Sequence, residues 1–204
     1  MNFLAHAILS FNRPEILVGN MISDFVKGKK QFEFNETIRL GIILHRAIDS
    51  FTDEHPITKS MKSFYKDEYG LYGAVLVDVS YDYFLANDEK IFPTKELLQS
   101  FTKNTYQQIE NHQHVLPENF ALAFSFMQRQ DWLFHYSTED GIAKSFAGLH
   151  RRSKYMKSTE QAMEIFRRNK NEMKSLYEDF FPRVNEYALT KLEALINAAS
   201  LSLT

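Results

Sequence analysis

The sequence predicts an all-α protein, for two reasons. Glycine and proline are scarce, with seven and five among 204 residues, and the only Asn-Gly or Asp-Gly turn signal is Asp140-Gly141, which lies in a helical context. Apolar residues instead recur at intervals of three and four, as at Leu40, Leu44, Ile48 and Phe51. No repeat, linker or low-complexity tract interrupts the chain, so we expect one compact multi-helix domain over residues 1–204.

Prolines and capping residues divide this pattern into helices. Proline fits the first turn of a helix but disrupts its interior, so Pro14, Pro56 and Pro182 are expected at helix boundaries, as are two further prolines. Thr94 and Ser158 are expected N-caps. The expected helices are, in chain order, 2–11, 15–28, 36–54, 56–68, 71–87, 94–114, 117–130, 138–151, 158–181 and a last one to about residue 200.

Helix 36–54 carries polar residues on an apolar face. At 100° per residue, His45 and Asp49 lie off the main core stripe, on a second face shared with Ile38 and Ile42. A solvated face does not normally carry two isoleucines. We therefore expect His45 and Asp49 to point into a pocket or a second packing surface.

Helix 71–87 shows the same anomaly with two carboxylates. Asp78 and Asp82 are one turn apart and share their face with apolar residues that include Val75 and Leu85. An isolated buried carboxylate costs several kcal/mol unless it is paired, protonated or bound to a metal, and two neighbouring ones repel each other. A positive group is therefore expected beside them.

Two further polar residues lie among apolar neighbours, His6 in the first helix and Asp24 in the second. Together with the four residues above, they form a set that a divalent ion such as Mn²⁺, Fe²⁺ or Mg²⁺ accepts. The chain has no cysteine, so any metal must be held by His and carboxylates. The alternative is that each residue is a structural hydrogen-bonding group, or, as for Asp49 or Asp53, an arginine partner or helix cap.

Composition excludes several classes of function. With 24 Lys and Arg against 26 Asp and Glu, the net charge of −2 gives no general electrostatic case for binding nucleic acid or an anionic membrane. No apolar run reaches the ~18–20 residues of a membrane-spanning helix, and no targeting signal is visible, so a cytoplasmic protein is expected. Serine-hydrolase elbows, phosphate-binding loops and His-Glu-x-x-His motifs are also absent from the sequence.

The first 85 residues contain four ordered blocks. They are Met1-Asn2-Phe3-Leu4-Ala5-His6, Gly19-Asn20-x-x-x-Asp24-Phe25-Val26-x-Gly28, His45-Arg46-x-Ile48-Asp49-x-x-Thr52-Asp53 and Asp78-Val79-x-x-Asp82-x-Phe84-Leu85. In order and spacing, these blocks resemble the bacterial acyl carrier protein phosphodiesterase family. A weaker similarity continues through Gln130, Trp132, Leu133, Tyr136 and Arg151-Arg152, so the resemblance covers most of the chain.

The resemblance implies a fold, an activity and a set of site residues. The family is a divergent relative of the HD-domain phosphohydrolases, so it implies an HD-domain-like helical bundle that uses a divalent metal, usually Mn²⁺. Its members remove the 4′-phosphopantetheine group from holo-acyl carrier protein by metal-assisted hydrolysis of a phosphodiester. By resemblance, the metal residues are His6, Asp24, His45 and Asp78, with Asp49 and Asp82 bound to the metal or to its ligands. In the mechanism this implies, Asp49, Asp82 and Arg46 are the candidate catalytic residues. Arg46 follows His45 where an HD protein has Asp, and it offsets phosphoryl charge or is a solvated surface residue.

The implied partner, holo-acyl carrier protein, is acidic, so a basic rim is expected around the site. Its candidate residues are Lys27, Lys29 and Lys30, and Arg151, Arg152, Lys154 and Lys157. Each cluster is also compatible with an ordinary solvated surface. Two other functions remain open: an HD-like phosphohydrolase that acts on a small nucleotide or phosphate ester, and a non-catalytic helical module that binds an acidic carrier protein.

Overall fold

The computed structural model describes residues 1–153 and 155–201, and in these residues it has α-helices and 3₁₀ turns but no strand. The predicted all-α class is therefore confirmed. The α-helices are α1 (Phe3–Ile8), α2 (Pro14–Ile22), α3 (Glu36–Glu54), α4 (Pro56–Tyr69), α5 (Gly73–Ala86), α6 (Lys95–Glu110), α7 (Glu118–Arg129), α8 (Trp132–His135), α9 (Glu139–Arg152) and α10 (Thr159–Leu201). The 3₁₀ turns are η1 (Ser23–Phe25), η2 (Gly28–Glu33), η3 (Gly70–Tyr72) and η4 (Gln113–Val115).

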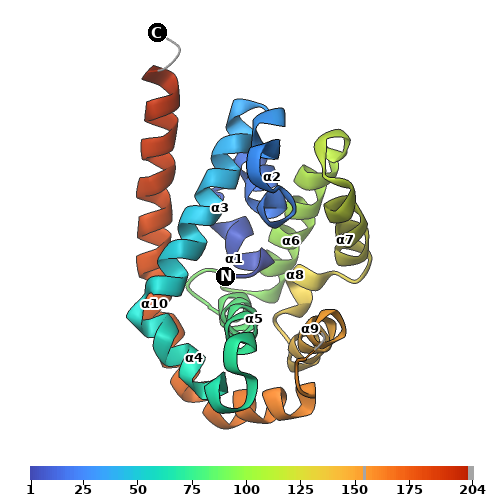
Figure 1. Ribbon diagram of the computed structural model, residues 1–204, viewed down its shortest axis with the longest axis vertical. Coiled ribbons are helices and arrows are strands. Elements are labelled where there is room, and N and C mark those ends of the chain that lie inside the picture. Colours follow the sequence, from blue (N-terminus) through green and yellow to red (C-terminus); the bar gives the residue numbers. More distant parts are fainter. Residues whose placement is uncertain (154, 202–204) are drawn as a thin grey trace.

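The short helix α1 lies near the centre of the molecule, and the longer helices surround it (Figure 1). It packs against α2 on one side and α5 on the other. Helix α3 lies against α2, while α10 contacts α9, α5, α4 and α3 in turn along the outside. This arrangement brings side chains from α1, α2 and α3 together in the interior.

Capping residues fix the start of several helices. The Asn35 side chain accepts a hydrogen bond from Ile38 N at 2.9 Å at the start of α3. Thr94 caps α6 as predicted, accepting from Leu97 N at 3.3 Å. Ser158 immediately precedes α10.

The prediction that a helix ends before Pro182 is wrong, because α10 continues through it to Leu201. Pro182 is exposed, so its ring faces solvent. On either side of it, Phe181 and Val184 are buried, and packing against neighbouring helices holds the chain helical across the lost backbone hydrogen bond. The second helix is also shorter than predicted, since α2 ends at Ile22 and gives way to η1.

Two glycines allow α2 and α3 to cross with their backbones in contact. A Cβ at Gly19 would lie 1.9 Å from Ile38 O, and one at Gly41 would lie 2.3 Å from Ile16 O. Only glycine permits such an approach. The crossing places the residue after Gly19, Asn20, beside His45, which lies one turn after Gly41 on α3.

In the described part of the chain, no helix combines the length and the apolar character needed to cross a membrane.

Candidate metal centre

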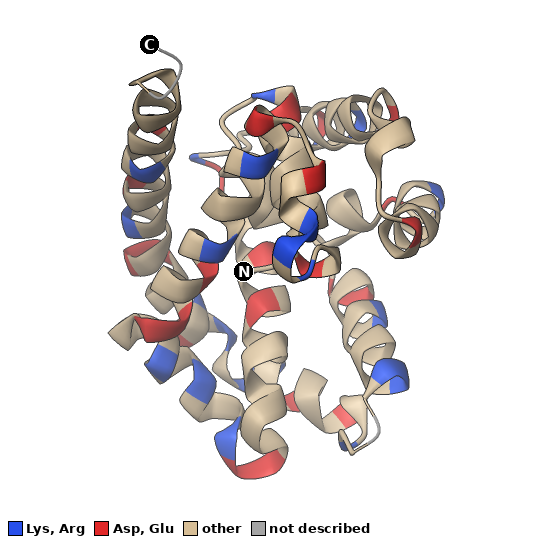
Figure 2. Ribbon diagram, turned by 45° about the horizontal axis from the view of Figure 1, so that its top comes forward, with Lys and Arg blue, Asp and Glu red and all other residues tan. Residues whose placement is uncertain are grey.

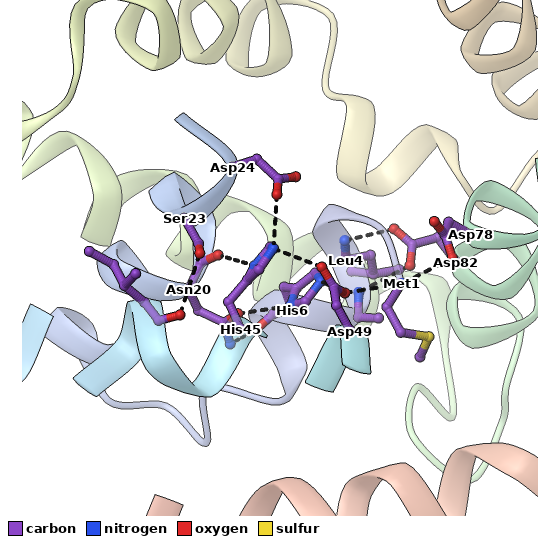
Figure 3. Close-up of polar contacts among 12 residues, drawn as sticks. Met1, Leu4, His6, Asn20, Ser23, Asp24, His45, Asp49, Asp78 and Asp82 are labelled. Atoms are coloured by element: carbon purple, nitrogen blue, oxygen red, sulfur yellow. Dashed lines mark hydrogen bonds and ion pairs between the residues drawn. The ribbon is translucent and has the colours of Figure 1, made fainter. Parts of the chain in front are cut away.

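Three side chains from two helices point toward one another in the interior (Figure 3). His6 projects from α1, and His45 and Asp49 project from α3, where they are one turn apart. One ligand atom from each of the three lies within 4.8 Å of the others. The two carboxylate oxygens of Asp49 divide between the rings, with Oδ1 3.2 Å from His6 Nε2 and Oδ2 3.1 Å from His45 Nε2.

Asp24 extends the cluster toward solvent. Its Oδ1 lies 3.3 Å from His45 Nε2, and its side chain is 73% exposed. The histidines are buried, and Asp49 is partly exposed. The cluster therefore has a closed inner side formed by the imidazoles and an outer side where Asp24 meets solvent.

The imidazole rings stack on each other, with centroids 3.9 Å apart and planes inclined by 15°. The nitrogen of each ring that points away from Asp49 is held by one residue, Asn20. His6 Nδ1 lies 2.8 Å from Asn20 Oδ1, and His45 Nδ1 lies 2.7 Å from the Asn20 backbone oxygen. Both Nε2 atoms consequently face Asp49.

Burial and mutual contact give the cluster unusual ionisation. Burial, reinforced by the nearby His45, lowers the pKa of His6 to about 4. Burial also opposes the charged form of His45, but hydrogen bonds to Asp24 and Asp49 outweigh it and raise its pKa to about 9. The pKa of Asp49 lies well below its usual range, because the facing histidines outweigh the effect of burial. The hydrogen bond from His45 likewise lowers the pKa of Asp24.

The residues fit a divalent ion on the evidence of two buried atoms. His6 Nε2 and Asp49 Oδ1 are inaccessible to solvent, and neither has a hydrogen-bond partner among the described residues. They are 3.2 Å apart. When the ring is neutral with its hydrogen on Nδ1, Nε2 and Oδ1 are two facing acceptors, and a cation bound to both stabilises them. Two imidazoles with carboxylates form a donor set suited to Mn²⁺ or Fe²⁺.

Asp78 and Asp82 do not join this cluster. Asp78 Oδ1 accepts a hydrogen bond from the Met1 α-amino group at 2.9 Å, and that group also lies 3.5 Å from Asp49 Oδ1. Burial raises the pKa of Asp78, and burial raises that of Asp82 to about 7. The positive group expected beside these carboxylates is thus an amino group for Asp78.

Asp82 is fully buried and holds the start of α1. Its Oδ2 accepts from Leu4 N at 2.8 Å, and its Oδ1 accepts from Ala5 N at 3.2 Å. These backbone groups belong to the first turn of α1, which otherwise lacks acceptors. Asp82 therefore fixes the helix that carries His6.

Arg46 points away from the cluster, toward the segment that follows Asp24. Its guanidinium donates to Val26 O and to Gln31 Oε1, each at 3.0 Å. These bonds tie α3 to Val26, just after η1, and to Gln31 within η2.

Two residues that shape the site were not selected from the sequence as functional. Asn20 lies in an apolar run from Ile16 to Ile22, and a buried amide there was the available signal. Gly41 lies inside a long helix, where glycine is unfavourable by about 1 kcal/mol, and this cost signals a close backbone contact.

Comparison with known proteins identifies the family. The model of the family "Acyl carrier protein phosphodiesterase" matches residues 1–184. The chain belongs to the acyl carrier protein phosphodiesterase family. An acyl carrier protein phosphodiesterase of Photorhabdus laumondii is 30% identical over 94% of this chain and 96% of its own length. Proteins of the same name from Serratia proteamaculans and Escherichia coli are 27% and 26% identical, each over 94% of this chain and 99% of their own length.

The match to the acyl carrier protein phosphodiesterase family includes every residue of the cluster and both glycines of the helix crossing. It ends within α10, two residues after Pro182. No solved structure is significantly similar to the chain.

Proposed function

We propose that this chain hydrolyses the phosphodiester bond that joins 4′-phosphopantetheine to holo-acyl carrier protein, releasing apo-acyl carrier protein. The names of its relatives supply the substrate. The observation that carries the proposal is the pair of buried acceptors, His6 Nε2 and Asp49 Oδ1, in a cluster open to solvent at Asp24. A distant relation to the HD-domain phosphohydrolases is part of the same proposal.

The proposed ligands of a divalent ion are His6 Nε2, His45 Nε2 and the Asp49 carboxylate, with Asp24 on the solvent side. Mn²⁺ is the ion we favour, with Mg²⁺ and Fe²⁺ as alternatives. When bound, such an ion supplies Lewis-acid chemistry to a phosphoryl oxygen. Asp24 is the most exposed of the four ligands and is the carboxylate that an incoming phosphodiester meets first.

The remaining predicted site residues act by positioning in this proposal. Asp82 holds α1 and with it His6, while Asp78 holds the amino group that faces Asp49. Arg46 fixes the segment after Asp24 rather than reaching the cluster. A metal-binding role for Asp78 and catalytic roles for Asp82 and Arg46 therefore remain predictions. In the structure, each of these residues makes a contact outside the cluster of His6, His45, Asp49 and Asp24.

The proposed docking surface for the acidic carrier is the basic segment of residues 27–30. Lys27, Lys29 and Lys30 are exposed, follow Asp24 directly, and form no ion pair within the described residues. In the view of Figure 2, basic positions appear next to the N-terminus, whose amino group lies near Asp49. Complementary charge of this kind speeds association and makes it depend on salt.

The second basic cluster is engaged in local contacts. Lys157 pairs with Glu68 at 2.8 Å, and Arg152 donates to Gly148 O at 3.2 Å. Lys154 lies outside the described residues. These contacts favour residues 27–30 as the carrier-binding surface.

Intact-mass spectrometry of holo-acyl carrier protein incubated with the purified chain and Mn²⁺ tests the proposed reaction. We expect loss of the 4′-phosphopantetheine mass, and we expect Asp49→Asn to abolish it. Asp53→Asn is the matched control, since Asp53 lies one turn further along α3 and pairs with Lys62 outside the cluster. Wild-type protein that releases nothing with Mn²⁺, Mg²⁺ or Fe²⁺ would overturn the proposal.

The same preparation separates the alternative functions. Hydrolysis of small phosphodiesters or nucleotides in preference to the carrier would indicate a small-molecule phosphohydrolase. Carrier binding that persists in Asp24→Asn, with no turnover by the wild type, would indicate a non-catalytic binding module.

A further inference from the structure

Asn20 is a fully buried polar residue at the point where α1, α2 and α3 meet. Its side chain contacts His6 and its backbone oxygen contacts His45, the two histidines of the cluster (Figure 3). The positions of the hydrogen atoms in these contacts can be deduced, because some of the partner atoms can only accept a hydrogen bond.

The orientation of the Asn20 amide is fixed by its nitrogen side. Nδ2 lies 3.0 Å from His6 O and 3.0 Å from Ser10 Oγ. A carbonyl oxygen only accepts, so the group facing His6 O must be the NH₂. Ser10 Oγ donates its own hydrogen to His6 O at 2.7 Å and is therefore free to accept from Asn20.

This orientation leaves Asn20 Oδ1 facing His6 Nδ1 at 2.8 Å. An amide oxygen accepts, so Nδ1 must carry the hydrogen. In the neutral ring, Nε2 then holds a lone pair directed at Asp49, which explains why Nε2 and Asp49 Oδ1 lack a hydrogen bond.

The backbone oxygen of the same residue sets the second ring. His45 Nδ1 lies 2.7 Å from Asn20 O, and this carbonyl also only accepts. His45 therefore carries a hydrogen on Nδ1, and its Nε2 is the nitrogen presented to Asp24 and Asp49.

We propose that Asn20 is a positioning residue: its side chain holds His6 with hydrogen on Nδ1 and leaves Nε2 unprotonated for a metal, and its backbone oxygen turns His45 so that Nε2 faces Asp24 and Asp49. The inference rests on the proposed metal site, which it deepens. Without the Asn20 side chain, His6 gains a hydrogen bond by moving its hydrogen to Nε2 and donating to Asp49. In that tautomer the hydrogen is on Nε2, so this nitrogen has no lone pair available to bind a metal. Groups that orient a ligating histidine in this way change metal affinity by about 10–100-fold.

Nuclear magnetic resonance of ¹⁵N-histidine-labelled, metal-free protein tests the tautomers directly. In the wild type we expect His6 to carry hydrogen on Nδ1 and none on Nε2. In Asn20→Leu, which keeps the side-chain bulk but removes the acceptor, we expect the hydrogen on Nε2. His45 is an internal control, because its partner is the backbone oxygen at position 20 and remains in the variant.

Ser10→Ala is the matched structural control. It removes a buried hydrogen bond to the Asn20 amide but leaves the contact between Asn20 Oδ1 and His6. We expect the His6 tautomer to stay unchanged in Ser10→Ala. For Mn²⁺ itself, calorimetry is expected to show affinity about 10–100-fold weaker in Asn20→Leu, and close to wild type in Ser10→Ala.

The outcomes separate this inference from the proposed function. A His6 ring with hydrogen on Nε2 in the wild type overturns the inference even if Asn20→Leu fails to fold. An unchanged His6 tautomer or unchanged Mn²⁺ affinity in a folded Asn20→Leu variant overturns it as well. Absence of carrier hydrolysis by a wild type that shows the expected tautomers and Mn²⁺ binding counts against the proposed reaction alone.

Discussion

Replacing Gly41 with alanine is expected to destabilise the protein, although the same change favours an isolated helix. The new Cβ would lie 2.3 Å from Ile16 O, 2.9 Å from Gly19 Cα and 3.0 Å from Asn20 N, whereas ordinary contacts begin at 3.4 Å. All three atoms belong to the backbone of α2 and cannot rotate away. Relief of the closest contact alone requires the two helices to separate by about 1 Å, in an interior that is close-packed.

The expected loss of stability follows from two opposing terms. Alanine gains about 1 kcal/mol over glycine in a helix interior. Overpacking against a rigid core costs about 1–3 kcal/mol and sometimes more, and contact with backbone atoms places Gly41→Ala at or above the upper end of that range. A net loss of about 2 kcal/mol lowers the Tm of a chain of this length by about 4–8 °C.

Separation of the helices also stretches the hydrogen bond between His45 Nδ1 and Asn20 O, now 2.7 Å, beyond useful length. Mn²⁺ affinity should therefore fall together with stability. Thermal unfolding followed by circular dichroism measures the first effect, and calorimetry with Mn²⁺ measures the second.

Gly148→Ala is the control for this substitution. A Cβ at Gly148, inside α9, meets only Arg151 Nη2 at 3.8 Å. The control should therefore gain up to about 1 kcal/mol and leave Mn²⁺ binding unchanged. A Gly41→Ala protein as stable as the wild type, or as stable as Gly148→Ala, would refute the proposed close crossing of α2 and α3.

Three further outcomes are expected. Mn²⁺ at 100 times its Kd should stabilise the wild type by about 2.7 kcal/mol, which raises Tm by about 5–11 °C, and chelation should reverse this shift. Asp49→Asn should lose the shift in the same thermal scan, while Asp53→Asn keeps it. Asp82→Ala leaves two buried N–H groups of α1 without acceptors and should cost at least about 2 kcal/mol in urea unfolding, with Asp82→Asn costing less. Pro182→Ala restores a backbone N–H within α10 at an exposed position and should stabilise the protein by about 1–3 kcal/mol in the same assay, whereas a loss of stability would show that α10 needs the proline.

The helical class and the polar residues of the interior were predictable because both depend on periodicity. The pattern on residues 36–54 placed His45 and Asp49 on one face, and the structure places both against His6. The path of α10 was not predictable in this way. A proline removes one hydrogen bond, and whether the helix continues depends on packing from α3, α4 and α5, which no local rule contains.

Helix-face patterns locate buried polar groups but do not identify their partners. Asp49 and Asp82 give the same signal in the sequence, a carboxylate among apolar residues. In the structure, Asp82 uses both oxygens to accept backbone N–H groups of α1, whereas Asp49 has one oxygen without a hydrogen-bond partner in the described chain. Both oxygens of Asp82 are therefore engaged, whereas Asp49 Oδ1 can still bind a ligand.

Asn20 and Asp49 both contact His6, but they have different roles. Asn20 has donors and acceptors that are all matched to fixed partners, so its orientation is determined and it can impose a tautomer. Asp49 faces the opposite edge of the ring, where its Oδ1 has no hydrogen-bond partner among the described residues and can bind a cation together with His6 Nε2. Rigid support on one edge and an unsatisfied acceptor on the other are the two conditions for a preorganised metal site, and neither can be read from residue spacing. The rigid support follows from the close crossing at Gly19 and Gly41, because this crossing brings Asn20 into contact with His45 while Asn20 also contacts His6 on α1.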